Sequence, residues 1–331
     1  MKTDWAVDKM PSLEGRTAVV TGASGGIGYE IALQLATRGA QVVLASRDWN
    51  RTDLARYRIQ TTSPGARLET MQLDLASLSS VRSFARHFQE RHGNLDILVN
   101  NAGISGGPRR ETEDGFERIF QVNYLGHFAL TGLLLPALCS RPGARVVTMS
   151  SDIAASGRID FYDLQGKHRY GLVSTYAQSK LANLIFAFEL ERRARQAGAP
   201  FSSFATHPGI ARTDLFSAKN EEWGRSLTVG EKLLQLVQAL LGRSADKGAL
   251  PALYQATDRL AQSSRYVGGA KWPRRFRPVI EPIPRQARDQ TIATRLWEIS
   301  KTLSGVHYEG LDLLRYPWTP SPARFDLLQG R

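Results

Sequence analysis

Tyr176 and Lys180 lie four residues apart, which is the spacing that places two side chains on one face of a helix. A tyrosine hydroxyl has a pKa of about 10 in water, and a neighbouring ammonium group favours the ionised form and so lowers that pKa. A tyrosine held in this way could exchange a proton with an alcohol or a carbonyl near neutral pH. An isolated pair at this spacing is more often an ordinary surface pair, so the chemistry needs support from other residues.

The glycine-rich segment 21–28 reads Thr-Gly-Ala-Ser-Gly-Gly-Ile-Gly and contains a second set of candidate residues. Glycine permits tight turns and close backbone approach, and the unpaired N–H groups at the start of a helix bind phosphate. The glycines have the spacing G-x-x-x-G-x-G, which differs from the common dinucleotide-binding spacing G-x-G-x-x-G. We therefore predict a pyrophosphate-binding turn formed by Gly22, Ser24, Gly26, Ile27 and Gly28.

Short apolar segments alternate with helical patterns along the chain, and these elements would position the candidate residues. Buried strands that alternate with helices predict a parallel sheet covered on both faces, which is the doubly wound, Rossmann-type α/β fold. Ligands bind at the carboxyl edge of such a sheet. The predicted strands are 17–20, 41–45, 68–73, 95–99, 145–149 and 201–205, and the predicted helices are 28–37, 78–90 and 175–196.

The pattern weakens after residue 210. The segments 231–241, 247–256 and 295–303 are predicted helices, and the Gly-, Pro- and Arg-rich segment 262–284 is predicted to be a loop. No Pro-, Gly- or Ser-rich linker divides the chain. We therefore predict a single domain over 13–305, followed by an extended C-terminal tail over 306–331.

Asn100, Ala102 and Gly103 belong to an Asn-Asn-Ala-Gly motif directly after the fourth predicted strand. Together with the glycine spacing and the Tyr-x-x-x-Lys pair, in this order, the motif makes residues 13–213 resemble the short-chain dehydrogenase/reductase family. The resemblance implies an oxidoreductase that binds a nicotinamide cofactor. Ser151 lies 25 positions before Tyr176, and this long spacing is similar to that of the retinol dehydrogenase-like branch.

The resemblance implies a role for each of four residues. Ser151 would polarise the substrate oxygen and Tyr176 would exchange the proton, while Lys180 would lower the pKa of Tyr176 and contact the nicotinamide ribose. An oxidised nicotinamide would lower that pKa further. Asn123, in an Asn-x-x-Gly motif, would hold a water that links Lys180 to bulk solvent. The neighbouring Ser150 has the alternative role of a strand-end hydroxyl that caps the backbone.

The choice of cofactor is predicted from the end of the second strand. A protein that prefers NAD commonly has Asp or Glu there, which accepts a hydrogen bond from the ribose 2′-OH. This chain has Ser46 and Arg47, which suit a 2′-phosphate, while Asp48 comes two positions late. We therefore predict NADP(H) in preference to NAD(H). Asp74 and Leu75 resemble the pair that contacts the adenine, although Asp74 could also be a helix N-cap.

A later motif resembles the one that closes over the nicotinamide, and it consists of Pro208, Gly209, Ile210 and Thr213. The segment that follows contains large apolar side chains, which would line an apolar substrate pocket or form the inner face of a packed helix. These are Leu215, Phe216, Trp223, Leu233, Leu234 and Val237. A small-molecule alcohol or carbonyl of apolar character is the substrate that the branch suggests.

The composition excludes several other classes of protein. The chain has 331 residues, of which 42% are hydrophobic, and a net charge of +12. No basic repeat interleaved with aromatic residues accompanies that charge, so nucleic-acid binding is not predicted. The histidines are scattered and predict no metal site. The single cysteine, Cys139, cannot form an internal disulfide, which favours a reducing, cytoplasmic location.

Residues 119–140 contain no Asp, Glu, Lys or Arg and are numerous enough to suggest a membrane span. Gln121, Asn123, His127 and Pro136 interrupt this segment, which favours a buried helix instead. The N-terminal residues lack the apolar core of a signal peptide.

The family resemblance also implies a homodimer, in which residues 115–139 and 175–196 pack against their symmetry mates. Three other interpretations stay open. The same fold could reduce a carbon–carbon double bond, or it could bind NADP(H) without catalysis as a sensor or scaffold. The basic surface and an aromatic tail with Trp318 and Phe325 could instead make peripheral contact with a membrane.

Overall fold

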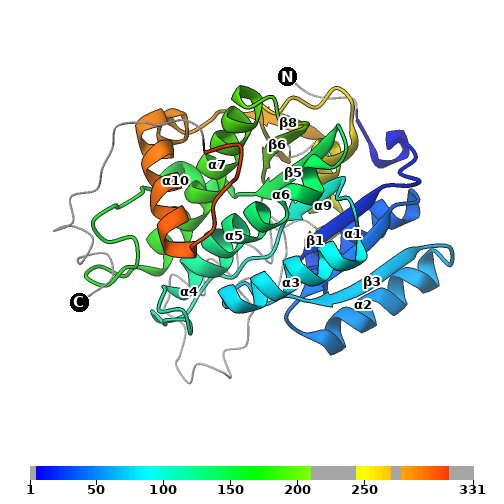
Figure 1. The fold of residues 1–331 in the computed structure, drawn as a ribbon, viewed down its shortest axis with the longest axis horizontal. Helices are drawn as coiled ribbons and strands as arrows, with labels where there is room; N and C mark the ends of the chain where they lie inside the picture. Colours follow the sequence, from blue (N-terminus) through cyan, green and yellow to red (C-terminus); the bar gives the residue numbers. More distant parts are fainter. Residues whose placement is uncertain (1–4, 210–243, 270–276, 313–331) are drawn as a thin grey trace.

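The computed structural model describes residues 5–209, 244–269 and 277–312 (Figure 1). Eight strands form one sheet in the order β3-β2-β1-β4-β5-β6-β7-β8. All neighbours are parallel except β7 and β8. This arrangement confirms the predicted doubly wound fold. The strands are β1 (Thr17–Thr21), β2 (Gln41–Ser46), β3 (Arg67–Gln72), β4 (Ile97–Asn100), β5 (Ala144–Met149), β6 (Phe201–Thr206), β7 (Tyr266–Gly269) and β8 (Pro278–Glu281).

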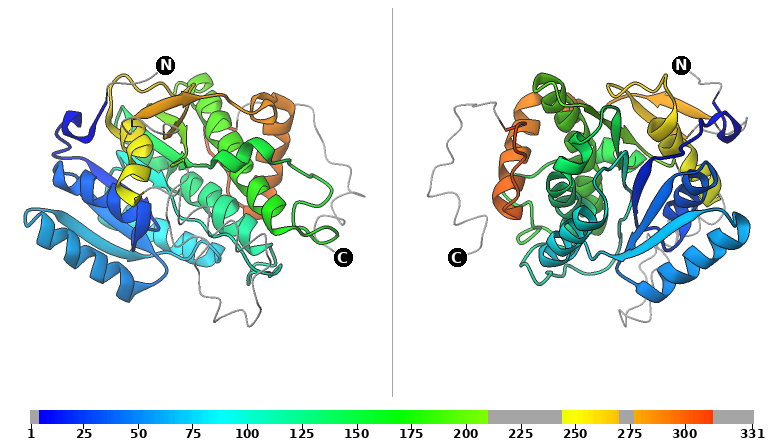
Figure 2. Two further views of the ribbon diagram at one scale, coloured as in Figure 1. Left: turned by 180° about the vertical axis from the view of Figure 1, so that it is seen from behind. Right: turned by 45° about the vertical axis from the view of Figure 1, so that its right-hand side comes forward.

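Helices cover both faces of the sheet (Figures 1 and 2). One core lies between the sheet and α1, α2 and α9, and the other lies between the sheet and α3, α5 and α7. α10 packs on the outside of α5 and α7. The helices are α1 (Gly26–Thr37), α2 (Trp49–Thr62), α3 (Leu78–Arg91), α4 (Arg118–Phe120), α5 (Gly126–Leu133), α6 (Leu135–Cys139), α7 (Leu172–Gln196), α9 (Ala245–Thr257) and α10 (Gln290–Ser304).

The central strands β1, β4 and β5 are mostly apolar because both faces of the sheet are covered there. In β1, Val19 contributes to one core, whereas Ala18 and Val20 contribute to the other. Successive side chains of a strand point to opposite faces, so a strand between two cores needs apolar residues at every position. The unbroken apolar pattern therefore predicted these strands correctly.

The helix α2 was not predicted from the sequence. Only three of its residues are buried, Thr52, Ala55 and Ile59, so the apolar periodicity of this helix is weak. Its start is nevertheless well defined, since the Asp48 side chain caps it by accepting a hydrogen bond from the Arg51 N–H at 3.0 Å.

The prediction of a loop over 262–284 is wrong, because this segment contains β7 and β8. β7 pairs with β6 and includes Gly268, where a Cβ atom would collide with the imidazole of His207. A strand that lies so close to a ring needs glycine, and glycine-rich sequence is more typical of loops. The predicted helix 231–241 lies outside the described residues.

The C-terminal helix α10 is longer than predicted, and the compact domain continues beyond it. Asp289 caps the start of α10, and Gly305 ends it with a φ of 62°. Val306, Tyr308 and Leu311 are then buried in the core. The predicted domain boundary at residue 305 is therefore too early, since the chain belongs to the domain at least as far as Leu311.

Residues 119–140 form buried helical segments, as predicted, within α4, α5 and α6. A π-helical turn, η2 (Gln121–Leu125), joins α4 to α5. Within the described parts of the chain, no helix combines the length and the apolar character that crossing a membrane requires.

The chain's own helix α10 covers part of the surface that is expected to form a homodimer. α10 packs against α5 and α7, and the Trp297 ring lies 5.2 Å from the ring of Phe128 and 6.0 Å from that of Phe186. The Tyr308 hydroxyl donates to the Phe128 carbonyl at 2.7 Å. Between Thr175 and Ala194, nearly every residue of α7 is buried. α10 therefore covers part of this surface, and the pairing of α5 and α7 with symmetry mates stays a prediction.

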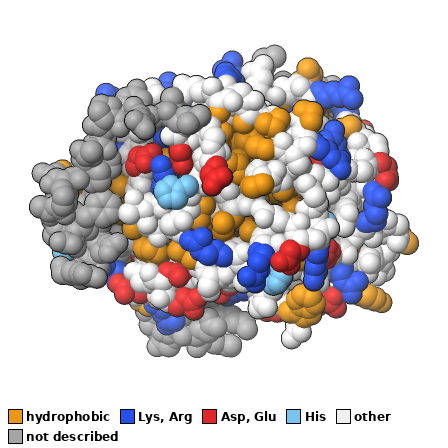
Figure 3. Space-filling model, in the orientation of Figure 1, with side chains coloured by type: hydrophobic (Ala, Val, Ile, Leu, Met, Phe, Trp, Pro, Cys, Tyr) orange, Lys and Arg blue, Asp and Glu red, His pale blue; other side chains and the backbone are white. Residues whose placement is uncertain are grey.

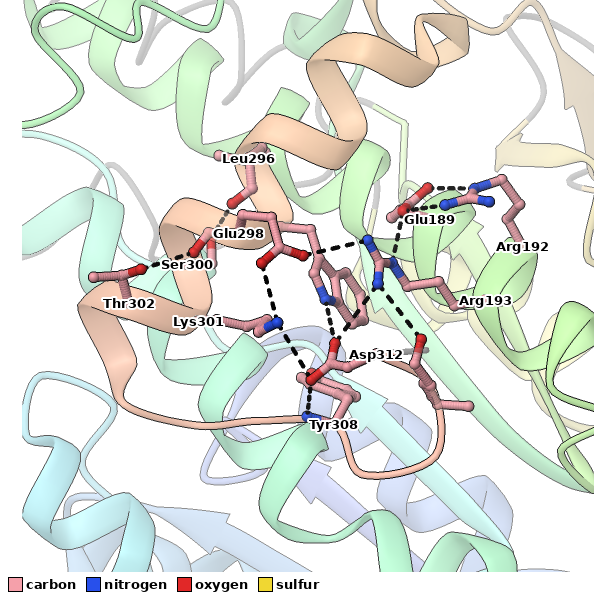
Figure 4. A network of polar contacts seen from close by, with 12 residues as sticks. Glu189, Arg192, Arg193, Leu296, Glu298, Ser300, Lys301, Thr302, Tyr308 and Asp312 are labelled. Carbon is pink, nitrogen blue, oxygen red and sulfur yellow. Dashed lines mark hydrogen bonds and ion pairs between the residues drawn. The ribbon is translucent and has the colours of Figure 1, made fainter. Parts of the chain in front are cut away.

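A cluster of charged residues attaches α10 to α7 (Figure 4). Arg193 is 1% exposed, and its Nε donates to Glu189 at 2.7 Å. Its guanidinium also lies 4.5 Å from the centre of the Trp297 ring and forms longer ion pairs with Glu298 and Asp312. A buried guanidinium needs such partners, because removing it from water without compensation would be costly.

Candidate active site

Tyr176 and Lys180 lie in the first half of α7, and their side chains are almost fully buried, at 6% and 4% exposure. The Lys180 Nζ lies 5.8 Å from the centroid of the Tyr176 ring. The Nζ donates at 3.3 Å to the carbonyl of Met149, the last residue of β5. The helix therefore brings both side chains to the carboxyl end of the sheet.

Two adjacent serines at this strand end face different ways. Ser151 caps the short 3₁₀ turn η3 (Asp152–Ser156), and its side chain hydrogen-bonds with that of Tyr176. Ser150 is buried, and its Oγ donates to the carbonyl of Lys180 at 2.7 Å. Ser151 thus faces the phenol, whereas Ser150 attaches β5 to α7.

Asn123 is fully buried in the π-helical turn and holds a loop from the end of β4. Its Oδ1 accepts from the Ile104 N–H at 2.7 Å, and its Nδ2 donates at 2.9 Å both to the Ile104 carbonyl and to Ser179 Oγ. A Cβ atom at Gly103 would lie 3.2 Å from both Asn123 Oδ1 and Lys180 Nζ. The side chains of Asn123 and Lys180 therefore both lie against Gly103 of this loop.

Burial dominates the protonation of the two α7 side chains. It raises the pKa of Tyr176 above its ordinary value, an effect that the hydrogen bond with Ser151 opposes, and it lowers the pKa of Lys180 to about 8. The prediction that the pKa of Tyr176 is lowered is therefore wrong for the protein's own groups taken alone, because burial raises that pKa. The phenol is therefore protonated at neutral pH, and a nearby positive charge, such as the Lys180 ammonium or an oxidised nicotinamide, would have to bring its pKa down for efficient proton exchange.

The glycine-rich turn has the geometry that a dinucleotide requires. Gly22 and Gly26 have φ values of 68° and 55°, a region that favours glycine. A Cβ atom on Gly28 would collide with the carbonyl of Gly22, so α1 can approach the turn only with glycine there. At Gly26, the first residue of α1, a Cβ would meet nothing within 4 Å, which leaves room before the helix N-terminus. Ile27 is buried in the core. These residues fit a pyrophosphate.

The end of β2 lies beside this turn. The Ser46 hydroxyl donates to Ser24 Oγ at 3.3 Å, and Arg47 is exposed. Asp48 caps α2, so its carboxylate already accepts a hydrogen bond within the protein. Sequence reasoning missed Arg51, whose guanidinium lies 3.8 Å from the place of a Cβ on Gly25. Arg51 could be found only once α2 was recognised, because one helical turn separates it from Arg47.

The residues of the Asn-Asn-Ala-Gly motif make contacts with two different elements. The Asn100 side chain is fully buried and donates to Thr131 Oγ1 at 3.0 Å, so it attaches β4 to α5. The backbone N–H of Ala102 instead donates to Thr21 Oγ1 at 2.9 Å, beside Gly103.

Asp74 and Leu75 follow β3 at the same edge of the sheet. Asp74 accepts a hydrogen bond from the Ala76 N–H at 2.9 Å. The N-cap of α3 is Ser77, so Asp74 does not cap that helix. Leu75 is buried against Gly126, where any side chain would collide with the Leu75 carbonyl.

Pro208 and Gly209 follow β6, whereas Ile210, Thr213 and the apolar residues after them lie outside the described residues. The structure adds a group behind Ser151 that sequence reasoning missed. His207 Nδ1 lies 3.0 Å from Asp152 Oδ1, and the Tyr266 hydroxyl donates to the Ser151 carbonyl at 3.1 Å. These residues come from three different strand ends, so no sequence spacing relates them.

Comparison with known proteins agrees with this geometry. A family model described as short chain dehydrogenase matches residues 16–223. Polyprenol dehydrogenase of Mus musculus is 40% identical over 314 residues, which is 92% of this chain and 88% of that protein. Retinol dehydrogenase 13 of Homo sapiens is 39% identical over 308 residues, with 92% of this chain and 89% of that protein covered.

Among solved structures, a crystal structure of a protein from Mycobacterium paratuberculosis is similar to this chain. The TM-score is 0.73 and the sequence identity is 37%, and the match covers 92% of this chain and 99% of that one. The similarity therefore extends well beyond the cofactor-binding half of the fold.

Proposed function

The chain belongs to the short-chain dehydrogenase/reductase family, in its retinol dehydrogenase-like branch, and is thus an NAD(P)-dependent oxidoreductase. On this basis we propose the following reaction and cofactor for the protein. It interconverts an alcohol and a carbonyl of an apolar small molecule, and it prefers NADP(H). The observation that carries this proposal is the convergence of Tyr176, Lys180 and Ser151 at the carboxyl end of β5.

The cofactor supplies the hydride when it is bound, and the residues of the chain manage charge and protons. In the reductive direction the Ser151 hydroxyl donates a hydrogen bond to the substrate oxygen, which stabilises the developing negative charge. Tyr176, which burial keeps protonated at neutral pH, then donates its proton to that oxygen. The Lys180 ammonium stabilises the phenolate. Asn123, whose side chain approaches Lys180 beside Gly103, holds the water that links Lys180 to bulk solvent.

The preference for NADP(H) rests on charges at the end of β2. Arg47 is exposed there, and Arg51 leans toward the glycine-rich turn. The carboxylate of Asp48 lies two positions beyond the end of β2, and one of its oxygens accepts the cap hydrogen bond from the Arg51 N–H. Two guanidinium groups beside this strand end favour a 2′-phosphate.

The test measures binding of NADPH and NADH to the purified protein by nicotinamide fluorescence. We expect NADPH to bind at least about tenfold more tightly, and Arg47→Ala to remove most of that difference while NADH binding is unchanged. The control is Arg86→Ala on α3, which removes an equally exposed arginine far from the glycine-rich turn. Preference for NADH would overturn the cofactor assignment.

Turnover is tested with retinal, an apolar unsaturated aldehyde, and product analysis distinguishes the chemical alternatives. We expect the allylic alcohol. A saturated aldehyde would instead identify a carbon–carbon double-bond reductase. NADPH binding without reduction of retinal or of simpler apolar aldehydes would favour the non-catalytic sensor or scaffold.

We also propose a cytoplasmic setting, since the single cysteine, Cys139, cannot form an internal disulfide. Peripheral contact with a membrane is the competing interpretation. Co-sedimentation with anionic vesicles that falls as salt rises would support it.

A further inference from the structure

His127 is a fully buried histidine on α5 that the proposed mechanism does not use. Both of its ring nitrogens have partners. Nδ1 lies 3.0 Å from the backbone carbonyl oxygen of Asn123, and Nε2 lies 2.9 Å from Thr21 Oγ1. The ring thus spans the distance between the π-helical turn and the last residue of β1.

The partners determine which nitrogen carries the proton. A carbonyl oxygen can only accept a hydrogen bond, so Nδ1 must be the N–H that donates to Asn123. Burial, together with the nearby charge of Lys180, lowers the pKa of His127 to about 4, so the ring is neutral and Nε2 has no hydrogen. The Thr21 hydroxyl therefore donates to Nε2 at 2.9 Å in preference to its other acceptor, the Val99 carbonyl, which lies farther away at 3.3 Å.

The Thr21 end of this bridge holds the loop after β4. Thr21 Oγ1 accepts hydrogen bonds from the backbone N–H groups of Asn101 and Ala102, both at 2.9 Å. The Asn101 side chain also donates to the Thr21 carbonyl at 2.8 Å. With one hydrogen donated and two accepted, the hydroxyl has used its whole capacity.

The Asn123 end holds the same loop two residues further on, at Ile104, through both atoms of its amide group. Residues 101–104 are therefore held at one end by Thr21 and at the other by Asn123, and Gly103 between them faces Lys180. Since His127 contacts both anchors, it sets the distance between them.

We propose that His127 is a positioning residue for the active site, which acts as one donor and one acceptor to align Asn123 with the loop that carries Ala102 and Gly103. The inference rests on the proposed function for its kinetic consequences, but its geometric content is independent of them. The two bonds serve different ends of the loop, so they should be separable by substitution.

The experiment compares two variants that each retain half of the ring's hydrogen bonds. In His127→Asn the amide nitrogen takes the place of Nδ1 and keeps the bond to Asn123, but Thr21 loses its nearer acceptor and can donate only to the Val99 carbonyl. In His127→Gln the longer amide reaches the place of Nε2 and keeps Thr21, but the Asn123 carbonyl loses its donor. The measurements are amide hydrogen exchange resolved by NMR, the Kd for NADPH, and kcat with retinal.

For His127→Gln we expect about tenfold faster exchange at the Ile104 amide and about tenfold lower kcat, with the Kd for NADPH little changed. For His127→Asn we expect about tenfold faster exchange at Asn101 and Ala102 and about tenfold weaker NADPH binding, with kcat largely retained. Equal losses in both variants, at all three amides, would show a merely structural role and overturn the proposal.

A measurement on the unsubstituted protein keeps the proposal testable if a variant does not fold. The ¹⁵N shifts of the His127 ring should show the Nδ1–H tautomer, and the Nε2–H tautomer would overturn the proposal. If NADPH does not bind at all, the proposed function fails, whereas the tautomer and the exchange pattern still test the role of His127.

Discussion

At the scale of single residues, the hydroxyl of Tyr176 is the group on which the proposed chemistry depends most. Replacing it by Tyr176→Phe keeps the buried ring and removes the proton donor. We expect kcat with retinal to fall by about 10²–10⁴, the range for loss of a general acid, while NADPH binding changes little. Steady-state kinetics and fluorescence titration measure the two effects.

The matched control for that change is Tyr124→Phe. Tyr124 is also a fully buried tyrosine, but its hydroxyl lies 2.7 Å from Ser300 on α10, away from the strand end. It should lose a little stability and keep its activity. A similar loss of kcat in both variants would mean that the tyrosine hydroxyl matters only for packing.

His127 also predicts a pH dependence of stability. Its pKa is about 4 in the folded chain and 6.5 when unperturbed, so the unfolded chain binds a proton at a higher pH than the folded one does. Stability therefore falls as the pH is lowered from 6.5 toward 4, by about 2 kcal/mol between pH 7 and pH 5.

Urea unfolding at pH 7 and pH 5 measures this loss. The part due to His127 should be missing in His127→Gln and should remain in His87→Gln, which changes an exposed histidine on α3. If all three proteins lose the same stability, the assignment to His127 does not hold.

At the scale of elements, the attachment of α10 to α7 depends on a buried charge cluster with three cations and three carboxylates (Figure 4). Arg193→Met should lower the free energy of unfolding by about 3 kcal/mol, at the lower end for a broken buried pair. The loss stays near that lower limit because Arg192 still pairs with Glu189 and Lys301 still pairs with Glu298 and Asp312.

Arg192→Met is the control, since this side chain is 23% exposed and contacts the same Glu189. A partly solvated ion pair should contribute less than about 1 kcal/mol. Urea denaturation with an unchanged m-value measures both variants. Equal effects would show that burial of Arg193 is not what makes the cluster important.

At the scale of the whole molecule, the packing of α10 favours a monomer of 36.7 kDa in sedimentation velocity over the homodimer that the family resemblance implies. A stable dimer buries about 800 Å² from each partner. α7 is already buried over most of its length within the chain, and α10 is one of the elements that pack against it. In Figure 3 apolar side chains still gather in the middle of the face formed by α5, α6 and α7. On these helices Leu133 and Phe188 are partly exposed and Pro136 is exposed.

Measurements over a wide range of protein concentration provide the test. A mass that stays at one chain supports the covering role of α10. A dimer that is lost on Phe188→Glu would show that the remaining apolar surface suffices for association, and it would contradict the expectation.

The sequence alone determined the features that depend on short distances along the chain. The apolar strands, the glycine spacing around Gly22, Gly26 and Gly28, and the Tyr176–Lys180 pair all follow from the periodicity of a strand, a turn or a helix. The doubly wound fold followed from the order of these elements, because few ways exist to cover both faces of a parallel sheet.

The tertiary structure alone decided whatever depends on neighbours that are distant in sequence. β7 looks like a loop until it pairs with β6, and Arg193 looks like a surface charge until α10 covers it. The pKa of Tyr176 rises because of burial that no spacing shows. His127 looked like an interruption of an apolar helix, and its two partners, Thr21 and Asn123, are defined only once β1 and the π-helical turn lie on either side of its ring.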